Sequence, residues 1–318
     1  MKTKRIIIPT YPPHFKWNEL FLRSVKKYCT DYENVKISFI IEKENDTLFN
    51  SFIADYKSDN IGVKFIEDLT QEYSKLKPPS DIWDKYTYQS IKKMMAVIKS
   101  DSELNLVLDS ENICVKKFKF CDLFRNHDKI YYCDWIISNV QKRVLKESNE
   151  IMNAPENTKW FFETSFWIYR KSIFKKILKH ILDVNGLSKS ELLKYLQTKV
   201  FFEKNLYDIY LLKNSLNSDL VDQRDSQFIF NNPLLYKKQI TTEHIISHIE
   251  SNEIDKYINF VNKRQYIIFR TNDLINNNLI DRIIKNTDLV VATLFDFRED
   301  FYNFWNERIN STGIKHEA

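Results

Sequence analysis

Two acidic side chains, Asp109 and Glu111, follow a run of apolar residues at 104–108 that has the composition of a buried strand. In extended backbone, residues two apart point to the same side, so these carboxylates would converge on one point. Ligands of open α/β sheets bind beyond the carboxyl ends of the strands, and paired carboxylates there suit Mg²⁺ or Mn²⁺ together with diphosphate oxygens. A polar turn that ends a strand is the alternative, and the apolar run favours the metal site.

Other candidate groups lie further along the chain. Glu163 interrupts an aromatic run at 160–167, and Glu203 has a similar setting. Buried acids are rare unless they are paired or functional, so either glutamate is a candidate general base, although aromatic runs also fill ordinary cores. His244 and His248 are four residues apart, which places both on one face of a helix and suits a metal pair. Surface histidines are the alternative interpretation.

Glycine is almost absent from the chain, and this excludes several nucleotide-binding classes. Its 318 residues include three glycines, whereas a P-loop, a dinucleotide-binding turn and a kinase glycine loop each need clustered glycines. A bound nucleotide diphosphate must therefore be neutralised in another way, for which a metal ion is the obvious substitute. The net charge of +5 does not discriminate between small anions, anionic membranes and nucleic acid.

Cysteine usage and hydropathy indicate the compartment. The four cysteines have no C-x-x-C spacing, which favours reduced thiols in a cytosolic protein. The three isoleucines near the N-terminus are too few for a signal peptide, and no apolar run approaches the length that spans a bilayer. We therefore expect a cytoplasmic protein, soluble or peripheral on the inner membrane.

Hydrophobic periodicity predicts an α/β protein. Within the first 70 residues, strands and helices alternate, with strands at 5–11, 35–42 and 63–69 and helices at 17–29 and 46–56. This order is typical of a parallel sheet covered by helices.

The remaining elements are less regular. A helix at 85–100 precedes strands that begin at 104 and 129, and residues 139–160 have a polar, loop-like composition. Helices are expected within 160–182 and 191–215, and strands and helices alternate again from 265 onwards. We expect one domain over 1–250 and a C-terminal α/β extension over 251–318.

The order of three segments resembles GT-A glycosyltransferases of bacterial surface-glycan pathways, such as those for lipooligosaccharide or capsule. The segments are a strand ending in Pro-Thr-Tyr, a helix carrying glutamine and lysines, and a strand ending in Leu-Asp-Ser-Glu. The last is similar to the D-x-D motif, with glutamate in the third position. The resemblance is best over 5–115 and fades after about 210. It implies a GT-A-like, Rossmann-type mixed sheet flanked by helices, with a helical or α/β C-terminal extension.

The resemblance also implies ligands and site residues. The donor would be a nucleotide sugar, a UDP-sugar in the first instance, bound with Mn²⁺ or Mg²⁺. Asp109 and Glu111 would bind the metal, and either His244 or His248 would complete its shell. Glu42 would reach the ribose or the base. The residues that would line the base and ribose are Pro9, Thr10 and Tyr11.

The helix at 85–100 would present Gln89, with Lys92 or Lys93, to the sugar-diphosphate. The alternative is a solvated helix face, because a period of 3.6 residues exposes at least one of the two lysines. The family also often carries an acid followed by a tyrosine near residue 203, so Glu203 competes with Glu163 for the role of base.

The predicted reaction is transfer of a hexosyl or N-acetylhexosaminyl group to a hydroxyl of a bacterial surface glycan, free or lipid-linked. A basic helix at 170–179 favours contact with an anionic membrane, unless it is the solvated face of a core helix. One rival is a module for single-stranded nucleic acid, based on basic and aromatic residues at 195–213. The small, spread charge argues against it, so no nucleic-acid partner is expected. A metal-dependent phosphohydrolase using Asp109 and Glu111 is the other rival, for which Asp134 is the obvious additional acid.

Overall fold

The computed structural model divides the chain into two compact units. The first unit is formed by Met1–Pro12, Val35–Asp109 and Phe124–Arg224, and the second unit by Pro13–Asn34, Ser110–Leu123 and Asp225–Ala318. The structure describes residues 3–124, 129–133, 139–155, 160–161, 166–216, 219–222, 266–269, 291–294 and 299–311. The boundary expected after residue 250 lies outside these ranges and stays a prediction.

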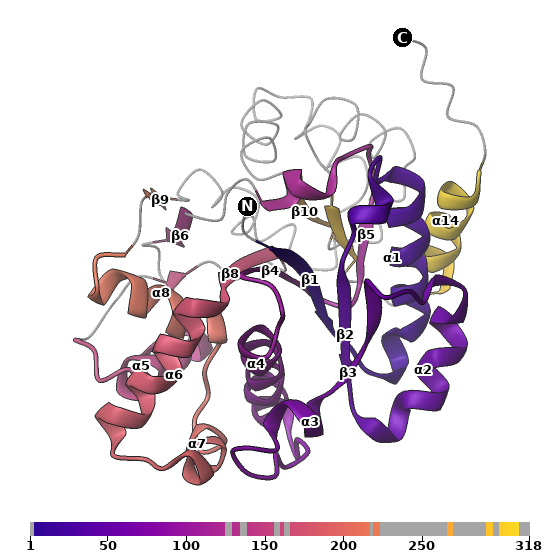
Figure 1. Cartoon of the computed structure of the whole chain (residues 1–318). Helices are drawn as coiled ribbons and strands as arrows, with labels where there is room; N and C mark the ends of the chain where they lie inside the picture. The colour runs from indigo at the N-terminus through magenta and orange to yellow at the C-terminus, as the bar shows by residue number, and fades with distance from the viewer. Residues whose placement is uncertain are drawn as a thin grey trace. The chain divides into compact units, whose positions relative to one another are not determined.

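A five-stranded mixed sheet forms the centre of the first unit, with the strand order β3-β2-β1-β4-β8 (Figure 1). Neighbouring strands among the first four are parallel, and β8 runs antiparallel to β4. The inner strands are apolar on both faces, as expected for a parallel sheet that is covered on both sides. The strands are β1 (Lys4–Pro9), β2 (Ile37–Ile41), β3 (Ile61–Phe65), β4 (Leu104–Leu108) and β8 (Phe166–Arg170).

Helices of the first unit pack their apolar sides on this sheet. One continuous core joins sheet residues such as Ile7 and Val107 to apolar residues of α4, α6, α7 and α8. On β2, Phe39 instead meets Phe49 of α2, with ring centroids 5.1 Å apart. The helices are α2 (Asp46–Ile53), α3 (Ile66–Thr70), α4 (Ile82–Ile98), α5 (Asn139–Ile151), α6 (Lys171–Asn185), α7 (Lys189–Leu196) and α8 (Glu203–Lys213), with short 3₁₀ turns at Lys43–Asn45 and Ala54–Tyr56.

Local capping explains where several of these helices begin and end. Asp81 caps α4, since its carboxylate accepts hydrogen bonds from the backbone N–H groups of Trp83 and Asp84 at 2.7 and 2.8 Å. Ser188 and Glu191 form a capping box at the start of α7. Gly186 ends α6 with a φ of 60°, a left-handed conformation that glycine adopts without strain.

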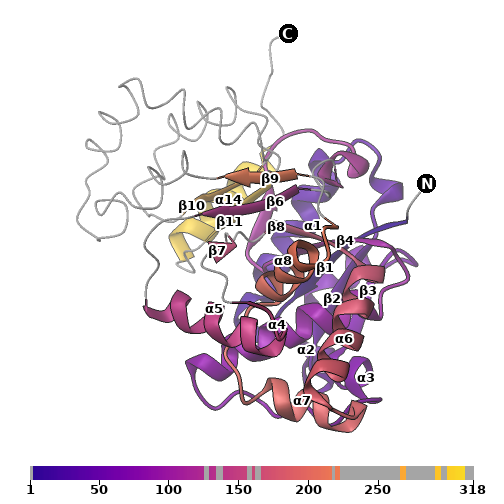
Figure 2. The ribbon, with the colours of Figure 1, turned by 90° about the vertical axis from the view of Figure 1, so that its left-hand side faces the viewer.

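A small second sheet of the first unit has the order β7-β6-β9 (Figure 2). β6 pairs antiparallel to β7 and parallel to β9. Its strands are β6 (Lys129–Cys133), β7 (Trp160–Phe161) and β9 (Asp219–Asp222).

The second unit combines early and late parts of the chain. Its three-stranded sheet has the order β10-β11-β5, with β10 and β11 parallel and β5 antiparallel to β11. The first helix packs against the last, since Arg23 donates to Asn306 at 2.6 Å and the rings of Trp17 and Tyr302 are 5.2 Å apart. The elements are α1 (Phe15–Tyr28), β5 (Asn112–Cys114), β10 (Tyr266–Phe269), β11 (Val291–Leu294) and α14 (Glu299–Asn310), with 3₁₀ turns at Pro12–His14, Tyr32–Asn34 and Phe120–Phe124.

The predicted α/β fold with a mixed sheet flanked by helices is confirmed, with three local corrections. The strand expected at 63–69 ends at Phe65, and its last residues form α3. The segment 139–160, expected to be a loop, contains α5, which buries Val144 and Leu145 beneath a charged surface. The helix expected over 191–215 is two helices, α7 and α8.

Candidate functional site

Three predicted site residues lie at one edge of the first unit's sheet. Thr10, Glu42 and Asp109 directly follow the parallel strands β1, β2 and β4. Because the carboxyl ends of parallel strands meet at the same edge, the sheet brings these three positions together. Helix α4 packs on β1 and carries the predicted residues Lys92 and Lys93.

Lys92 joins the ends of β1 and β2. Its ammonium Nζ donates to the backbone oxygen of Thr10 at 3.0 Å and to Glu42 Oε1 at 3.0 Å. Tyr88, one turn earlier on α4, donates its hydroxyl to the same Glu42 oxygen at 3.1 Å. Burial lowers the pKa of Lys92, and the Glu42 carboxylate opposes that shift. Burial, reinforced by Glu42, also raises the pKa of Tyr88, which therefore stays a hydrogen-bond donor.

Lys93 lies between two carboxylates. Its Nζ is 3.0 Å from Asp109 Oδ1 and 3.8 Å from Glu203 Oε1. The same ammonium is 3.8 Å from the centre of the Trp167 ring, a cation–π contact. The side chain of Asp109 is 27% exposed, whereas that of Glu203 is 2% exposed. Asp109 is thus the solvent-facing member of a largely buried ionic cluster.

The alternative interpretation, a solvated helix face that exposes at least one of Lys92 and Lys93, is wrong. Lys92 is 0% exposed and Lys93 is 8% exposed. Every residue from 90 to 98 is buried, so this end of α4 is covered all round rather than along one stripe. Both charges are accommodated because carboxylates and a backbone oxygen meet them inside the protein.

Buried acid and phenol groups surround Glu203. Tyr169 donates its hydroxyl to Glu203 Oε1 at 3.3 Å. Burial raises the pKa of Tyr169 well above its usual value, and the charges of Glu203 and Asp208 raise it further, so this hydroxyl stays protonated. On the same helix as Glu203, burial raises the pKa of Asp208 to about 6, although its ion pair with Lys204 opposes the shift.

The turn after β4 alters the expected geometry of Asp109 and Glu111. Extended backbone ends at Leu108, and Ser110 and Glu111 form a turn, so the alternation on which the predicted convergence depends does not apply here. Asp109 belongs to the first unit and Glu111 to the second. Glu111 is 3.4 Å from His14 Nδ1.

The described residues do not by themselves fit a divalent cation. Among them, no group of three or more His, Cys, Asp or Glu side chains could hold a metal ion. Asp109 instead binds the ammonium of Lys93. The predicted ligands His244 and His248 lie outside the described residues.

A separate polar cluster lies in the second unit around Ser110. The Ser110 hydroxyl donates to Glu111 Oε2 at 3.1 Å and therefore accepts the hydrogen bond from His14 Nδ1. Asn18 of α1 donates to the backbone oxygen of Ser110 at 2.7 Å. All four residues are buried. These contacts fix the second half of the Asp-Ser-Glu motif on the beginning of α1.

The other predicted site residues are placed as follows. Pro9 is buried in β1 opposite Ile40, Tyr11 is exposed, and Gln89 is half-buried on α4. Glu163 lies outside the described residues, as does Asp134.

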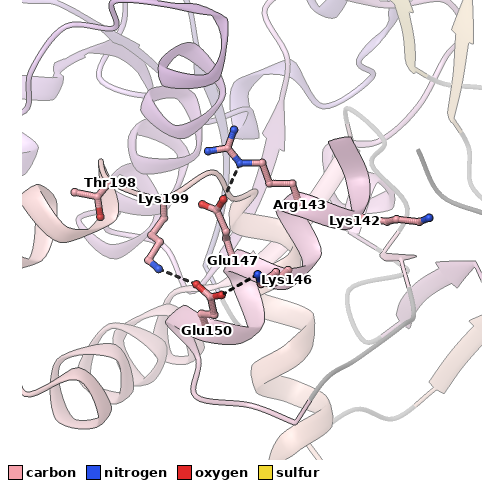
Figure 3. Close-up of a pocket in the computed structure, with 7 residues that line it drawn as sticks. All are labelled: Lys142, Arg143, Lys146, Glu147, Glu150, Thr198 and Lys199. Atoms are coloured by element: carbon pink, nitrogen blue, oxygen red, sulfur yellow. Dashed lines mark hydrogen bonds and ion pairs between the residues drawn. The ribbon is translucent and has the colours of Figure 1, made fainter. Parts of the chain in front are cut away.

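A surface pocket of 460 Å³ lies elsewhere in the first unit, along α5 and the segment after α7 (Figure 3). None of the predicted site residues is among those that line it. Its bases pair with its acids, since Arg143 contacts Glu147 at 2.7 Å and Lys199 contacts Glu150 at 2.8 Å. The four bases of the lining outnumber its two acids, so the pocket keeps a net positive charge.

The basic helix predicted to touch a membrane has its apolar side buried. In α6, Ile173, Phe174, Ile177 and Leu178 belong to the core, whereas Lys175, Lys176 and Lys179 are exposed. Only its cations are therefore available to a lipid surface. In the parts of the chain that the structure describes, no helix is long and apolar enough to cross a bilayer.

Sequence reasoning did not identify Tyr88, His14, Tyr169 and Asp208. Asp208 carries the same signal as Glu203, an acid among apolar residues. His14 and Tyr88 have no such signal, because their roles depend on partners that are 46 or more residues away along the chain.

No family model and no curated protein matches the chain. Solved structures do match it. Galactosyltransferase LgtC, in complex with donor and acceptor sugar analogs, is 10% identical with a TM-score of 0.45, and the match covers 98% of each chain. Mouse xyloside xylosyltransferase 1 is 9% identical with a TM-score of 0.40, over 69% of this chain and 85% of that one. The bifunctional glycosyltransferase WbbM is 10% identical with a TM-score of 0.45, over 98% of this chain and 50% of that one. All three are glycosyltransferases, the class of enzyme that the sequence resembles.

Proposed function

We propose that the chain is a glycosyltransferase that moves a sugar from a nucleotide sugar to a hydroxyl group at the carboxyl edge of the first unit's sheet. One observation carries the proposal: the buried ammonium of Lys93 is held between Asp109 and Glu203 at that edge. Burying a lysine with two carboxylates carries a large desolvation penalty, and such arrangements cluster at functional sites. An open α/β sheet binds its ligands at this same edge.

In this proposal different strand ends bind different parts of the donor. Thr10 and Glu42, at the ends of β1 and β2, bind the nucleoside, with Pro9 and Tyr11 beside it. Asp109 and Lys93, with Gln89, serve the sugar and its diphosphate. The support is that α4 joins Thr10 and Glu42 through Lys92 and pairs with Asp109 through Lys93.

A carboxylate must accept the proton of the acceptor hydroxyl if the reaction inverts the sugar. Glu203 is proposed for this role, with Glu163 as the other candidate. The support for Glu203 is its position beside Lys93 and the hydrogen bond from Tyr169, which together fix the carboxylate in place. A surface-glycan hydroxyl, free or lipid-linked, and a hexosyl or N-acetylhexosaminyl donor are the proposed substrates.

A divalent cation at Asp109 and Glu111 is a separate proposal, with His244 or His248 as a further ligand. A bound Mn²⁺ or Mg²⁺ would neutralise the leaving diphosphate. The transfer reaction as proposed above does not depend on it. Chelation of the purified protein, followed by addition of Mn²⁺, decides between the two cases.

The experiment that tests the function is donor turnover. The protein is incubated with UDP-, GDP-, ADP- and CDP-sugars together with surface-glycan acceptors, whose hydroxyl groups take the sugar, and the release of nucleoside diphosphate is measured. We expect release from one donor class, and loss of at least about a hundredfold in Asp109→Asn, because a carboxylate at the reacting group is replaced by an amide. Asp55→Asn, an exposed acid of the same unit, is the matched control and should turn over normally. Absence of turnover with every donor, or full activity in Asp109→Asn, contradicts the proposal.

A further inference from the structure

Lys92 is the most completely buried cation of the candidate site. Its side chain is 0% exposed, yet it lies beside Lys93, which serves a different carboxylate. Two of its three N–H donors are accounted for by the Thr10 carbonyl and by Glu42, each at 3.0 Å. With no exposed surface, the Lys92 ammonium cannot itself contact a ligand in this conformation.

Lys92 instead acts on Glu42, whose side chain is 21% exposed. Glu42 Oε1 accepts hydrogen bonds from both the Lys92 ammonium and the Tyr88 hydroxyl. Among the residues that the structure describes, Oε2 has a single long contact of 3.4 Å, from Asn45 Nδ2. One oxygen is thus anchored by two donors, and the other is left with most of its accepting capacity. A carboxylate oxygen accepts hydrogen bonds and does not donate them, so Oε2 can receive an N–H or O–H group.

We infer that Lys92 and Tyr88 are positioning residues that fix Glu42 as the acceptor for an O–H or N–H group of the donor nucleoside. The inference rests on the proposed function, because it names what the end of β2 does for that same donor. It also gives a different role to Lys92, which with Lys93 was one of two candidates for the sugar-diphosphate. Lys92 acts through Glu42 and the Thr10 carbonyl, and so sets donor affinity rather than the chemical step.

Removing a positioning residue should therefore affect KM and Kd for the donor more than kcat. Loss of a hydrogen bond to a charged group is worth roughly tenfold or more in affinity. We expect Tyr88→Phe, which keeps the ring and removes one anchor, to weaken nucleotide binding by about threefold to tenfold. We expect kcat at saturating donor to change by less than about twofold, because the reacting groups are elsewhere.

Lys92→Met alone is a poor test, because it leaves Glu42 partly buried without its cation and so threatens the fold. The double variant Lys92→Met/Glu42→Gln removes both charges and should recover most of the thermal stability. Its nucleotide affinity should stay at least about tenfold below that of the wild type, because the anchored carboxylate is gone. Tyr86→Phe is the matched control on α4, since Tyr86 is 40% exposed and contacts Phe202 rather than Glu42.

The probes are UDP, GDP, ADP and CDP, each with ribose and with 2′-deoxyribose, titrated by calorimetry. Support requires that the wild type and Tyr86→Phe bind one nucleotide equally, and that Tyr88→Phe and the folded double variant bind it more weakly. The ribose 2′-hydroxyl is the group recognised if the loss disappears with the deoxy form, and a base N–H or the 3′-hydroxyl if it persists. Equal binding by all four proteins overturns the inference and leaves the proposed function intact. Failure of the wild type to bind any of these nucleotides, or to turn over their sugars, overturns both.

Discussion

The Lys93 cluster allows a quantitative prediction for Lys93→Met. With an effective dielectric constant of about 20, charges 3.0 and 3.8 Å apart attract by roughly 5.5 and 4.4 kcal/mol. Desolvation of the ammonium offsets much of this attraction. Removing the cation also removes this desolvation cost, but it leaves two carboxylates without this counter-ion, and one of them is almost fully buried. Breaking a buried pair in this way costs about 3–5 kcal/mol, and loss of the contact with Trp167 adds to that.

We therefore expect Lys93→Met to lower the free energy of unfolding by about 3–5 kcal/mol in urea at pH 7. Lys85→Met, an exposed lysine on the same helix, should change it by less than about 0.5 kcal/mol. The double variant Lys93→Met/Glu203→Gln should regain part of the loss, because the more buried carboxylate no longer carries a charge. If Lys93→Met unfolds within about 1 kcal/mol of the wild type, the cluster does not hold the ionic network deduced from these distances.

Three further predictions concern other groups. Asp208 has a pKa of about 6 in the folded protein, against a usual value of 3.8. The unfolded chain therefore loses its proton first, and the free energy of unfolding falls as the pH rises from about 4 to 6. Asp208→Asn should abolish that slope and be up to about 3 kcal/mol more stable at pH 7, as measured by urea titrations across this range. Glu203→Gln should reduce the transfer rate by about 10²–10⁴-fold while nucleotide affinity stays within about threefold, and a near-normal rate would transfer the role of base to another acid. Vesicle co-sedimentation should depend on anionic lipid and weaken with salt, and neutralising the exposed cations of α6 should reduce it; binding that ignores both lipid charge and salt would exclude contact through them. Those cations are Lys175, Lys176 and Lys179.

The sheet was predictable because its strands carry a local signal. The segments that became β1, β2 and β4 are short apolar runs bounded by polar or proline residues, and alternation with helices implies parallel order. α5 was missed for the opposite reason. Its apolar residues are few and are separated by charged side chains that form ion pairs along the helix, such as Arg143 with Glu147. A segment of this composition resembles a loop until a core covers its narrow apolar side.

The sequence predicted which types of residue form the candidate site, but it did not predict which of them pair with one another. The sequence placed acids at the ends of β2 and β4 and lysines on the helix between them, and the structure brings these groups together. It could not show that Lys92 would pair with Glu42 and Lys93 with Asp109, because this pairing depends on how α4 is rotated on the sheet. The sequence offered a polar turn after Asp109 as the alternative to the metal site, but it could not show that the chain then passes into the second unit.

Two neighbouring lysines that serve two different strand ends impose a constraint on insertions and deletions. One residue added to or removed from α4 between its cap at Asp81 and Lys92 would rotate everything that follows by about 100°. Both ammonium groups would then leave their carboxylates at once, and the uniformly buried end of the helix would have nowhere else to place them. Because one helical turn contains 3.6 residues, inserting a few residues does not add a whole number of turns, so no small insertion restores the register. The length of α4 from cap to lysines should therefore be as intolerant of change as any residue in the site, which a scan of single-residue insertions through 82–91 would measure directly.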